Sequence, residues 1–309
     1  MTHVLIISDI EGSSACWDRA GAAFLTRQWR KACIGMSLDI NAVVTALFAA
    51  GAASVRVKDF HRTGYNLITS VIHPGAQIDQ GYHAGPVPGV GDPGECRTLM
   101  MIGMHAASGT AGFIPHTLTS RISSLVINGC PTAEVSLFAA SLAPFGLRPA
   151  FFSGCPRACR QALSAMPEIH THAIDKSGGL EDFDAVAYRH RLAEAAVASL
   201  SNDAAEPFDW QGPFDVRVTF RNGPPAARQI GDRWGYQVDR DMVLFRADHF
   251  REMYMTLIRI CYLTPLREKI LPFSLGAFNA MGRLGLAYAK MMESSRIRSL
   301  RHADDELTY

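Results

Sequence analysis

The chain has 309 residues, of which 48% are hydrophobic and 19% charged, and its formal net charge is +1. This composition indicates a globular protein with a substantial core, built as one large domain or two ordinary ones. The near-neutral balance excludes the overall field that would attract nucleic acid or an anionic membrane. Seven scattered cysteines without a CxxC pair, and a start without a signal-peptide pattern, predict a cytoplasmic protein with reduced thiols.

Strands and helices are predicted to alternate through the first half of the chain. Short apolar runs of buried-strand type predict strands at 3–8, 54–58, 97–103, 123–129 and 148–154. Helical periodicity predicts helices over 22–51, 131–146 and 156–166. This order predicts an α/β fold, with a mostly parallel sheet and flanking helices.

A polar, irregular stretch at 200–213 marks a predicted domain boundary. We therefore expect an α/β metal-binding catalytic domain at 1–200, a smaller α+β domain at 201–265 and a helical C-terminal extension at 266–309. Residues 270–292 are nearly all apolar and long enough to cross a membrane, but Pro272, Asn279 and Arg283 interrupt them. We expect this helix to pack on the body of the protein or on a neighbouring subunit, and a membrane is not expected as a partner.

Ionisable side chains follow four successive predicted strands. In sheets of parallel strands, ligands bind beyond the carboxyl ends of the strands, so these side chains are expected to meet at one edge. In chain order the residues are Asp9 and Glu11, then His61, then His105, then Glu134.

Two imidazoles and three carboxylates are ligands that suit zinc or a similar divalent ion. Five ligands exceed what one tetrahedral catalytic site uses, whereas two metal ions bridged by a carboxylate use them all, and Asp9 is the best candidate for the bridge. Taken singly, each residue has a simpler explanation as a helix cap or a loop side chain. Asp59 either orients a ligand imidazole or forms a turn.

Five motifs occur in order: "SDIEG", "KDFH", "GMHA", the "PH" that ends at His116, and "INGCPTAE". With these motifs the chain resembles the D-aminopeptidase family of dinuclear-zinc metallopeptidases, of the bacterial dipeptide-operon type, from residue 4 to about 265. The resemblance implies an α/β domain followed by a smaller α+β domain, and assembly into a homo-oligomer, often a decameric ring. It also implies His116 as the catalytic residue and two zinc ions held by Asp9, Glu11, His61, His105 and Glu134.

The chain departs from the family pattern at two places near the substrate edge. Around Glu134 the family usually has Gly-Glu-x-Gly, and here Ala133 and Ser136 replace the two glycines. After the next strand the family usually has Ser-Gly-Asp, and here Cys155 replaces the aspartate. Both changes leave the metal ligands intact and bear on which peptide is accepted.

The resulting hypothesis is a zinc-dependent aminopeptidase that hydrolyses short peptides, including those with N-terminal D-amino acids, with a metal-activated water. His116 would act as base, acid or nucleophile, and Asn66 would orient the substrate. One alternative is a metal-dependent amidohydrolase acting on another small amide, such as a cell-wall fragment or a secondary-metabolite intermediate. The other is a non-catalytic, metal-stabilised oligomeric binding protein.

Overall fold

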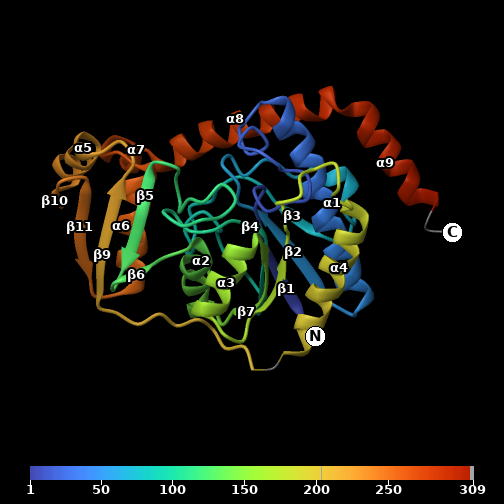
Figure 1. Ribbon diagram of the computed structural model, residues 1–309, viewed down its shortest axis with the longest axis horizontal. Coiled ribbons are helices and arrows are strands. Elements are labelled where there is room, and N and C mark those ends of the chain that lie inside the picture. The colour runs from blue at the N-terminus through green and yellow to red at the C-terminus, as the bar shows by residue number, and fades with distance from the viewer. Residues whose placement is uncertain (203, 307–309) are drawn as a thin grey trace.

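The first strand of the chain places its apolar side chains on both faces of a sheet. Val4 and Ile6 belong to one hydrophobic cluster and Leu5 and Ile7 to another, because successive side chains of a strand point to opposite faces. The structure is a computed structural model that describes residues 1–202 and 204–306, with side chains up to residue 300. It contains a six-stranded parallel sheet in the order β3-β2-β1-β4-β7-β8 (Figure 1). The strands are β1 (His3–Ser8), β2 (Ser54–Asp59), β3 (Gln77–Asp79), β4 (Thr98–Met104), β7 (Arg148–Gly154) and β8 (His170–Ala173).

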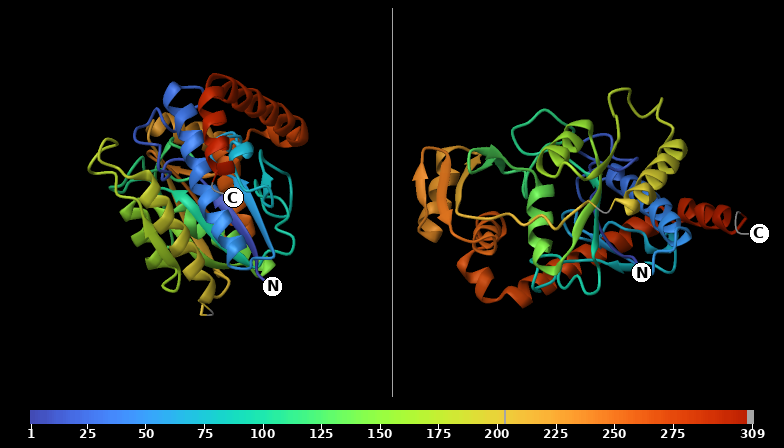
Figure 2. Two further views of the ribbon diagram at one scale, coloured as in Figure 1. Left: turned by 90° about the vertical axis from the view of Figure 1, so that its right-hand side faces the viewer. Right: turned by 90° about the horizontal axis from the view of Figure 1, so that it is seen from below.

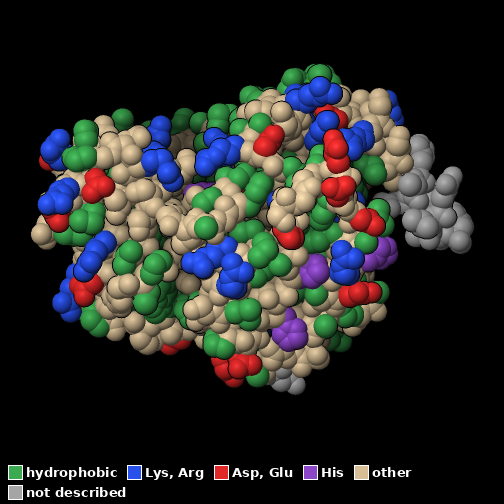
Figure 3. Space-filling model, viewed as in Figure 1, with side chains coloured by type: hydrophobic (Ala, Val, Ile, Leu, Met, Phe, Trp, Pro, Cys, Tyr) green, Lys and Arg blue, Asp and Glu red, His purple; other side chains and the backbone are tan. Residues whose placement is uncertain are grey.

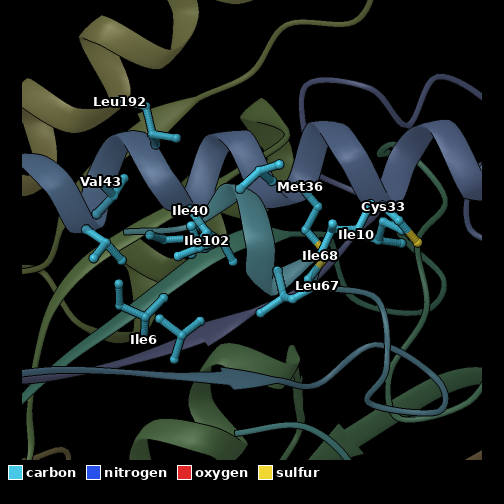
Figure 4. Packing of buried hydrophobic residues seen from close by; sticks show 14 of the residues in the cluster. Ile6, Ile10, Cys33, Met36, Ile40, Val43, Leu67, Ile68, Ile102 and Leu192 are labelled. Atoms are coloured by element: carbon cyan, nitrogen blue, oxygen red, sulfur yellow. The ribbon is translucent and has the colours of Figure 1, made fainter. Parts of the chain in front are cut away.

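Helices cover both faces of the parallel sheet, which confirms the predicted α/β class. The long helix α1 lies over Ile6 and Ile102 and packs its own Met36, Ile40 and Val43 onto them (Figure 4). On the first face are α1 (Arg27–Ala49) and α4 (Ala185–Ala198), and on the second are α2 (Glu134–Leu142) and α3 (Pro156–Ala165). Short 3₁₀ turns are found at Thr69–Val71, Ala143–Phe145 and Ser199–Ser201.

A second, antiparallel sheet lies beside the first (Figure 1). Its central strand β9 alternates buried and exposed side chains, as expected when one face packs on a core and the other meets water. Helices α5 (Pro224–Trp234) and α6 (Phe250–Tyr262) pack on the buried face. The strand order is β10 (Gln237–Asp239), β11 (Met242–Ala247), β9 (Phe214–Phe220), β5 (Ile122–Ile127) and β6 (Cys130–Pro131).

The prediction that 123–129 forms a fourth strand of the parallel sheet is wrong. This segment is β5, and it pairs antiparallel with β9 in the second sheet. The reason lies in its side chains: Ser123 and Ser124 are only partly buried, so the strand suits a sheet with a single covered face. Between β4 and α2 the chain therefore contributes β5 and β6 to the second sheet. The domain boundaries expected from composition remain a prediction.

The C-terminal segment forms three helices, α7 (Pro265–Lys269), α8 (Leu271–Met292) and α9 (Ser294–Glu306). Figures 1 and 2 show α8 and α9 running along the outside of the molecule beside α1. The inner face of α8 packs on the body through Gly282, Gly285, Leu286 and Ala289, as expected, and its outer face exposes Leu284.

One described helix, α1, is long and apolar enough to cross a membrane by length and composition, and 61% of its apolar window is buried inside the protein. Charged side chains of both signs are interspersed over the face shown in Figure 3, as the net charge of +1 suggests.

Candidate metal centre

The exits of β1 and β4 touch, and this contact brings their side chains together. The N–H of Asp9 donates to the carbonyl of Ile102 at 2.9 Å, and the N–H of Gly12 donates to that of Gly103 at 2.7 Å. Gly103 has a φ of +78°, and a Cβ there would overlap the carbonyl of Asp9. Only glycine suits this backbone and this approach.

Asp9 lies at the centre of the resulting cluster. Its Oδ1 is 3.0 Å from Nδ1 of His61, and its Oδ2 is 3.3 Å from Nε2 of His105. Glu11 Oε2 lies 3.0 Å from the same Nδ1 of His61, and Glu134 Oε2 lies 3.6 Å from Nε2 of His105. All five predicted ligands are buried in one place, with the Asp9 carboxylate between the two imidazoles.

Each imidazole has one nitrogen fixed by a backbone carbonyl. His61 Nε2 lies 3.0 Å from the carbonyl of Ala22, and His105 Nδ1 lies 3.1 Å from that of Ala106. His116 Nδ1 lies 3.1 Å from the carbonyl of Ile114. Because a carbonyl only accepts, the nitrogen facing it carries hydrogen and donates. The other nitrogen of each ring faces the carboxylates, which is the arrangement of metal-binding histidines.

His116 is presented by a tight loop. Ile114 and Leu118 on either side of it have φ of +45° and +61°, a region that a β-branched residue such as isoleucine rarely adopts. The ring of His116 stacks on that of His105, with centroids 3.7 Å apart and planes 13° apart. Its Nε2 is 4.0 Å from Glu11 Oε1, so His116 lies beside the predicted ligands.

Burial and mutual charge shift the pKa of every group in the cluster. Burial and the charge of Glu11 raise the pKa of Asp9 to about 7. Burial opposes the charged form of His61, but the charge of Glu11 and the close approach of both carboxylates outweigh it and raise its pKa to about 10. The pKa of His105 is raised by Glu134 in the same way. Burial and the charge of His105 lower the pKa of His116, which favours a neutral imidazole.

Glu134 reaches the cluster by a different route from the one that the sequence suggested. It is the first residue of α2, and the chain arrives there from the second sheet through β6, not from an exit of the parallel sheet. The N–H of Leu118 donates to Glu134 Oε1 at 2.6 Å and holds that oxygen, which leaves Oε2 facing His105.

Asn66, predicted to orient substrate, has no exposed surface. Its amide donates to Asp59 Oδ1 and to the carbonyl of His61, each at 2.8 Å, and its Oδ1 accepts from Nε1 of Trp29 at 2.9 Å. Asp59 also accepts the backbone N–H groups of Asn66 and Leu67. Asn66 thus holds the backbone of His61, and Asp59 holds Asn66 in place; both side chains are fully buried.

Three residues that sequence reasoning did not single out hold the loop that carries Glu11. Lys176 Nζ donates to the carbonyls of Glu11 and Ser13, at 2.6 and 2.9 Å, and to that of Cys16. Asp39 accepts from the backbone and hydroxyl of Ser14, and Arg189 donates to both Asp39 and Ser14.. These partners are 25 to 175 residues apart in the sequence, and no local pattern indicates them.

The donors fit two divalent ions. Asp9, Glu11 and His61 offer ligand atoms within 4.8 Å of one another, as do His105, His116 and Glu134. Glu11 Oε2 and His105 Nε2 are buried without a hydrogen-bond partner, which is costly for polar atoms unless a cation binds them. Oxygen and imidazole donors of this kind suit zinc.

Comparisons with known proteins identify the family of the chain and a related fold. The model of peptidase family M55, described as D-aminopeptidase, matches residues 2–258. A D-aminopeptidase of Bacillus subtilis (strain 168) is 25% identical over 171 residues, which are 55% of this chain and 62% of the relative. The match thus spans less than two thirds of that relative. The fold is shared with a solved structure, that of the Zn-dependent D-aminopeptidase DppA from Bacillus subtilis, which is described as a self-compartmentalizing protease. The two structures match with a TM-score of 0.76 and 22% sequence identity, over 84% of this chain and 96% of the other. The chain belongs to the M55 D-aminopeptidase family of peptidases.

Proposed function

We propose that the protein is a zinc-dependent aminopeptidase that hydrolyses short peptides, including those with an N-terminal D-amino acid. One observation carries the proposal: three imidazoles are each fixed by a carbonyl at one nitrogen and turn the other towards three buried carboxylates. Without a cation, that arrangement leaves polar atoms unsatisfied. Family membership and the zinc dependence of the Bacillus structure support the choice of metal and reaction.

Glu11 and His61 would hold one zinc ion and His105 and Glu134 the other, with the Asp9 carboxylate lying between the two sites. When bound, the ions supply an acidified water and polarise the scissile carbonyl. His116 is the most open member of the cluster, with 20% of its side chain exposed, while those of the five ligands are at most 9% exposed. Substrate would therefore approach past His116.

His116 would act as the general base. Its Nδ1–H is occupied by the carbonyl of Ile114, so only Nε2 can accept the proton from the attacking water. Its lowered pKa keeps Nε2 free to accept at neutral pH. The same nitrogen can then return the proton to the leaving amine, which balances the reaction.

The experiment compares zinc content and hydrolysis in three proteins purified without chelator. We expect about two zinc ions per native chain and a sharp loss in His61→Ala. In His116→Ala, hydrolysis of D- and L-aminoacyl amides should fall at least 100-fold. The zinc content of this variant should stay close to that of the native protein, because the five predicted ligands are unchanged. A native protein with well under one zinc per chain would overturn the proposal. Zinc without turnover of any amide would favour the binding-protein alternative.

We also propose that the chain works as a cytoplasmic homo-oligomer, with a decameric ring as the specific form. The outer face of α8 supports this, because it exposes Phe273, Met281, Leu284, Tyr288 and Met291 along one side of the helix. The solved Bacillus structure is described as self-compartmentalizing. A decamer of 33.7-kDa chains has a mass of about 337 kDa, which light scattering can distinguish from smaller assemblies. If Leu284→Glu leaves the native mass unchanged, this face is not the interface.

A further inference from the structure

Helix α8 lies outside the part of the chain that matches the family, which ends at residue 258. Its inner face nevertheless contacts three segments that surround His61: the loop before α1, the loop after β2 and the turn at Gly81–Tyr82. These contacts are made by residues at three successive turns of the helix, Asn279, Gly282 and Gly285.

Asn279 binds the backbone of Tyr82 through both ends of its amide. Its Oδ1 accepts the N–H of Tyr82 at 2.9 Å, and its Nδ2 donates to the carbonyl of Tyr82 at 3.1 Å. The hydroxyl of Tyr82 in turn donates to the carbonyl of Phe60 at 3.0 Å. Phe60 immediately precedes His61, so a single side chain of α8 is linked to the backbone of a metal ligand through one residue.

Gly282 and Gly285 let the helix approach closely enough for these bonds. A Cβ at Gly282 would overlap Tyr65, and a Cβ at Gly285 would overlap the ring of Phe24. Phe24 meets Trp29 edge to face at 5.0 Å, and Trp29 donates to Asn66, whose amide holds the carbonyl of His61.

The end of α8 is tied down as well. Glu293 forms an ion pair with Arg30 of α1 at 3.4 Å, and the guanidinium of Arg30 lies 5.5 Å from the ring centre of Tyr288. Arg30 and Glu293 are both mostly buried, so this pair is shielded from water more than a surface pair is.

We propose that α8 is a strap that positions the His61 imidazole for zinc, with Asn279 as the positioning residue. The strap fixes the backbone on both sides of His61, and the loop before α1 supplies the Ala22 carbonyl that orients its ring. The proposal rests on the zinc sites of the proposed function. It assigns α8 to the Asp9, Glu11 and His61 site alone, because among the described residues the hydrogen bonds that start from α8 lead to Phe60, next to His61, and none leads to His105, His116 or Glu134.

The test follows zinc release from the native protein, Asn279→Ala and Arg283→Gln to a colorimetric chelator in excess. Arg283 is exposed on the same helix, outside the apolar face proposed as the subunit interface, and is the matched control. In Asn279→Ala, we expect one of the two zinc ions to leave about 10-fold faster while the other keeps its native rate, as for other residues that support a ligand. A helix that only stabilises the fold would give unchanged release, or equal acceleration of both ions, and either result overturns the proposal.

Amide hydrogen exchange of the metal-free proteins keeps the two proposals separable. Residues 60–66 and 81–82 should exchange faster in Asn279→Ala than in the native protein or Arg283→Gln, while 105–118 stays unchanged. Unchanged exchange at 60–66 overturns the strap whatever the zinc content. A native chain that binds no zinc overturns the proposed function, and the exchange result still decides whether α8 holds the His61 segment.

Discussion

Replacing Lys176 by methionine should loosen the loop that carries Glu11. The ammonium of Lys176 donates to the carbonyls of Glu11, Ser13 and Cys16, so one side chain closes this loop from the inside. It also lies 4.3 Å from the ring centre of Phe113, in the loop that leads to His116. Methionine keeps the apolar length of lysine but donates nothing, so the three carbonyls lose their common partner.

The expected loss follows from those bonds. Three hydrogen bonds at a net value of roughly 1 kcal/mol each give a loss of roughly 3 kcal/mol in the free energy of unfolding. The positive charge strengthens the bonds, whereas burial of the ammonium, which lowers the pKa of Lys176 to about 8, works against them. We expect these two effects to offset each other in part. The carbonyls left without a donor add to the loss, so the expected total stays at about 3 kcal/mol.

Urea unfolding of the metal-free protein, followed by circular dichroism, measures this loss directly. Lys31→Met, at an exposed position of α1, is the control and should change the free energy of unfolding by no more than about 0.5 kcal/mol. A loss below about 1 kcal/mol for Lys176→Met, with an unchanged m-value, would show that the loop at residues 11–16 is held by other contacts and would refute the reasoning.

Three further outcomes are expected. Gly103→Ala should lower the thermal midpoint far more than Gly94→Ala, since both glycines have positive φ but only at Gly103 would a Cβ overlap the carbonyl of Asp9; equal losses would mean that φ alone decides. Asn66→Ala should cost roughly 3 kcal/mol in urea unfolding, for three buried side-chain hydrogen bonds, whereas exposed Asn222→Ala should be nearly neutral. A thiol reagent should label Cys130 rapidly in the folded protein and the six buried cysteines only on unfolding; rapid labelling of a second thiol would contradict the packing.

The parallel sheet and most of the cluster could be predicted because they follow from local patterns. Continuous apolar runs identify β1 and β4, and β2 is a short valine-rich segment. The rule that side chains meet at the carboxyl ends of parallel strands brings Asp9, His61 and His105 together. The same rule correctly placed Glu134 near His105, but for a wrong reason. From its sequence alone β5 looks like a further strand of the parallel sheet, whereas it pairs with β9 in the second sheet.

What the sequence did not indicate depends on contacts between distant segments. In the sequence Lys176 is an ordinary loop lysine, and its role depends on the fold, which places it beside the loop that carries Glu11. Asn66 is buried and bonded because Trp29 of α1 donates to it. The docking of α8 depends on Gly282 and Gly285, because a larger side chain there would overlap Tyr65 or Phe24, which are far away in the sequence.

The path of the chain through the second sheet sets the order in which the cluster can assemble. Glu134 follows directly on β5 and β6, and β5 is paired with β9, which begins at Phe214. During synthesis, the strands that carry Asp9, His61 and His105 emerge well before β9 does. The last predicted ligand therefore has its native support only after about two thirds of the chain has been made. A nascent or truncated chain would lack the complete cluster, so we expect the cluster to close only once the second sheet has formed.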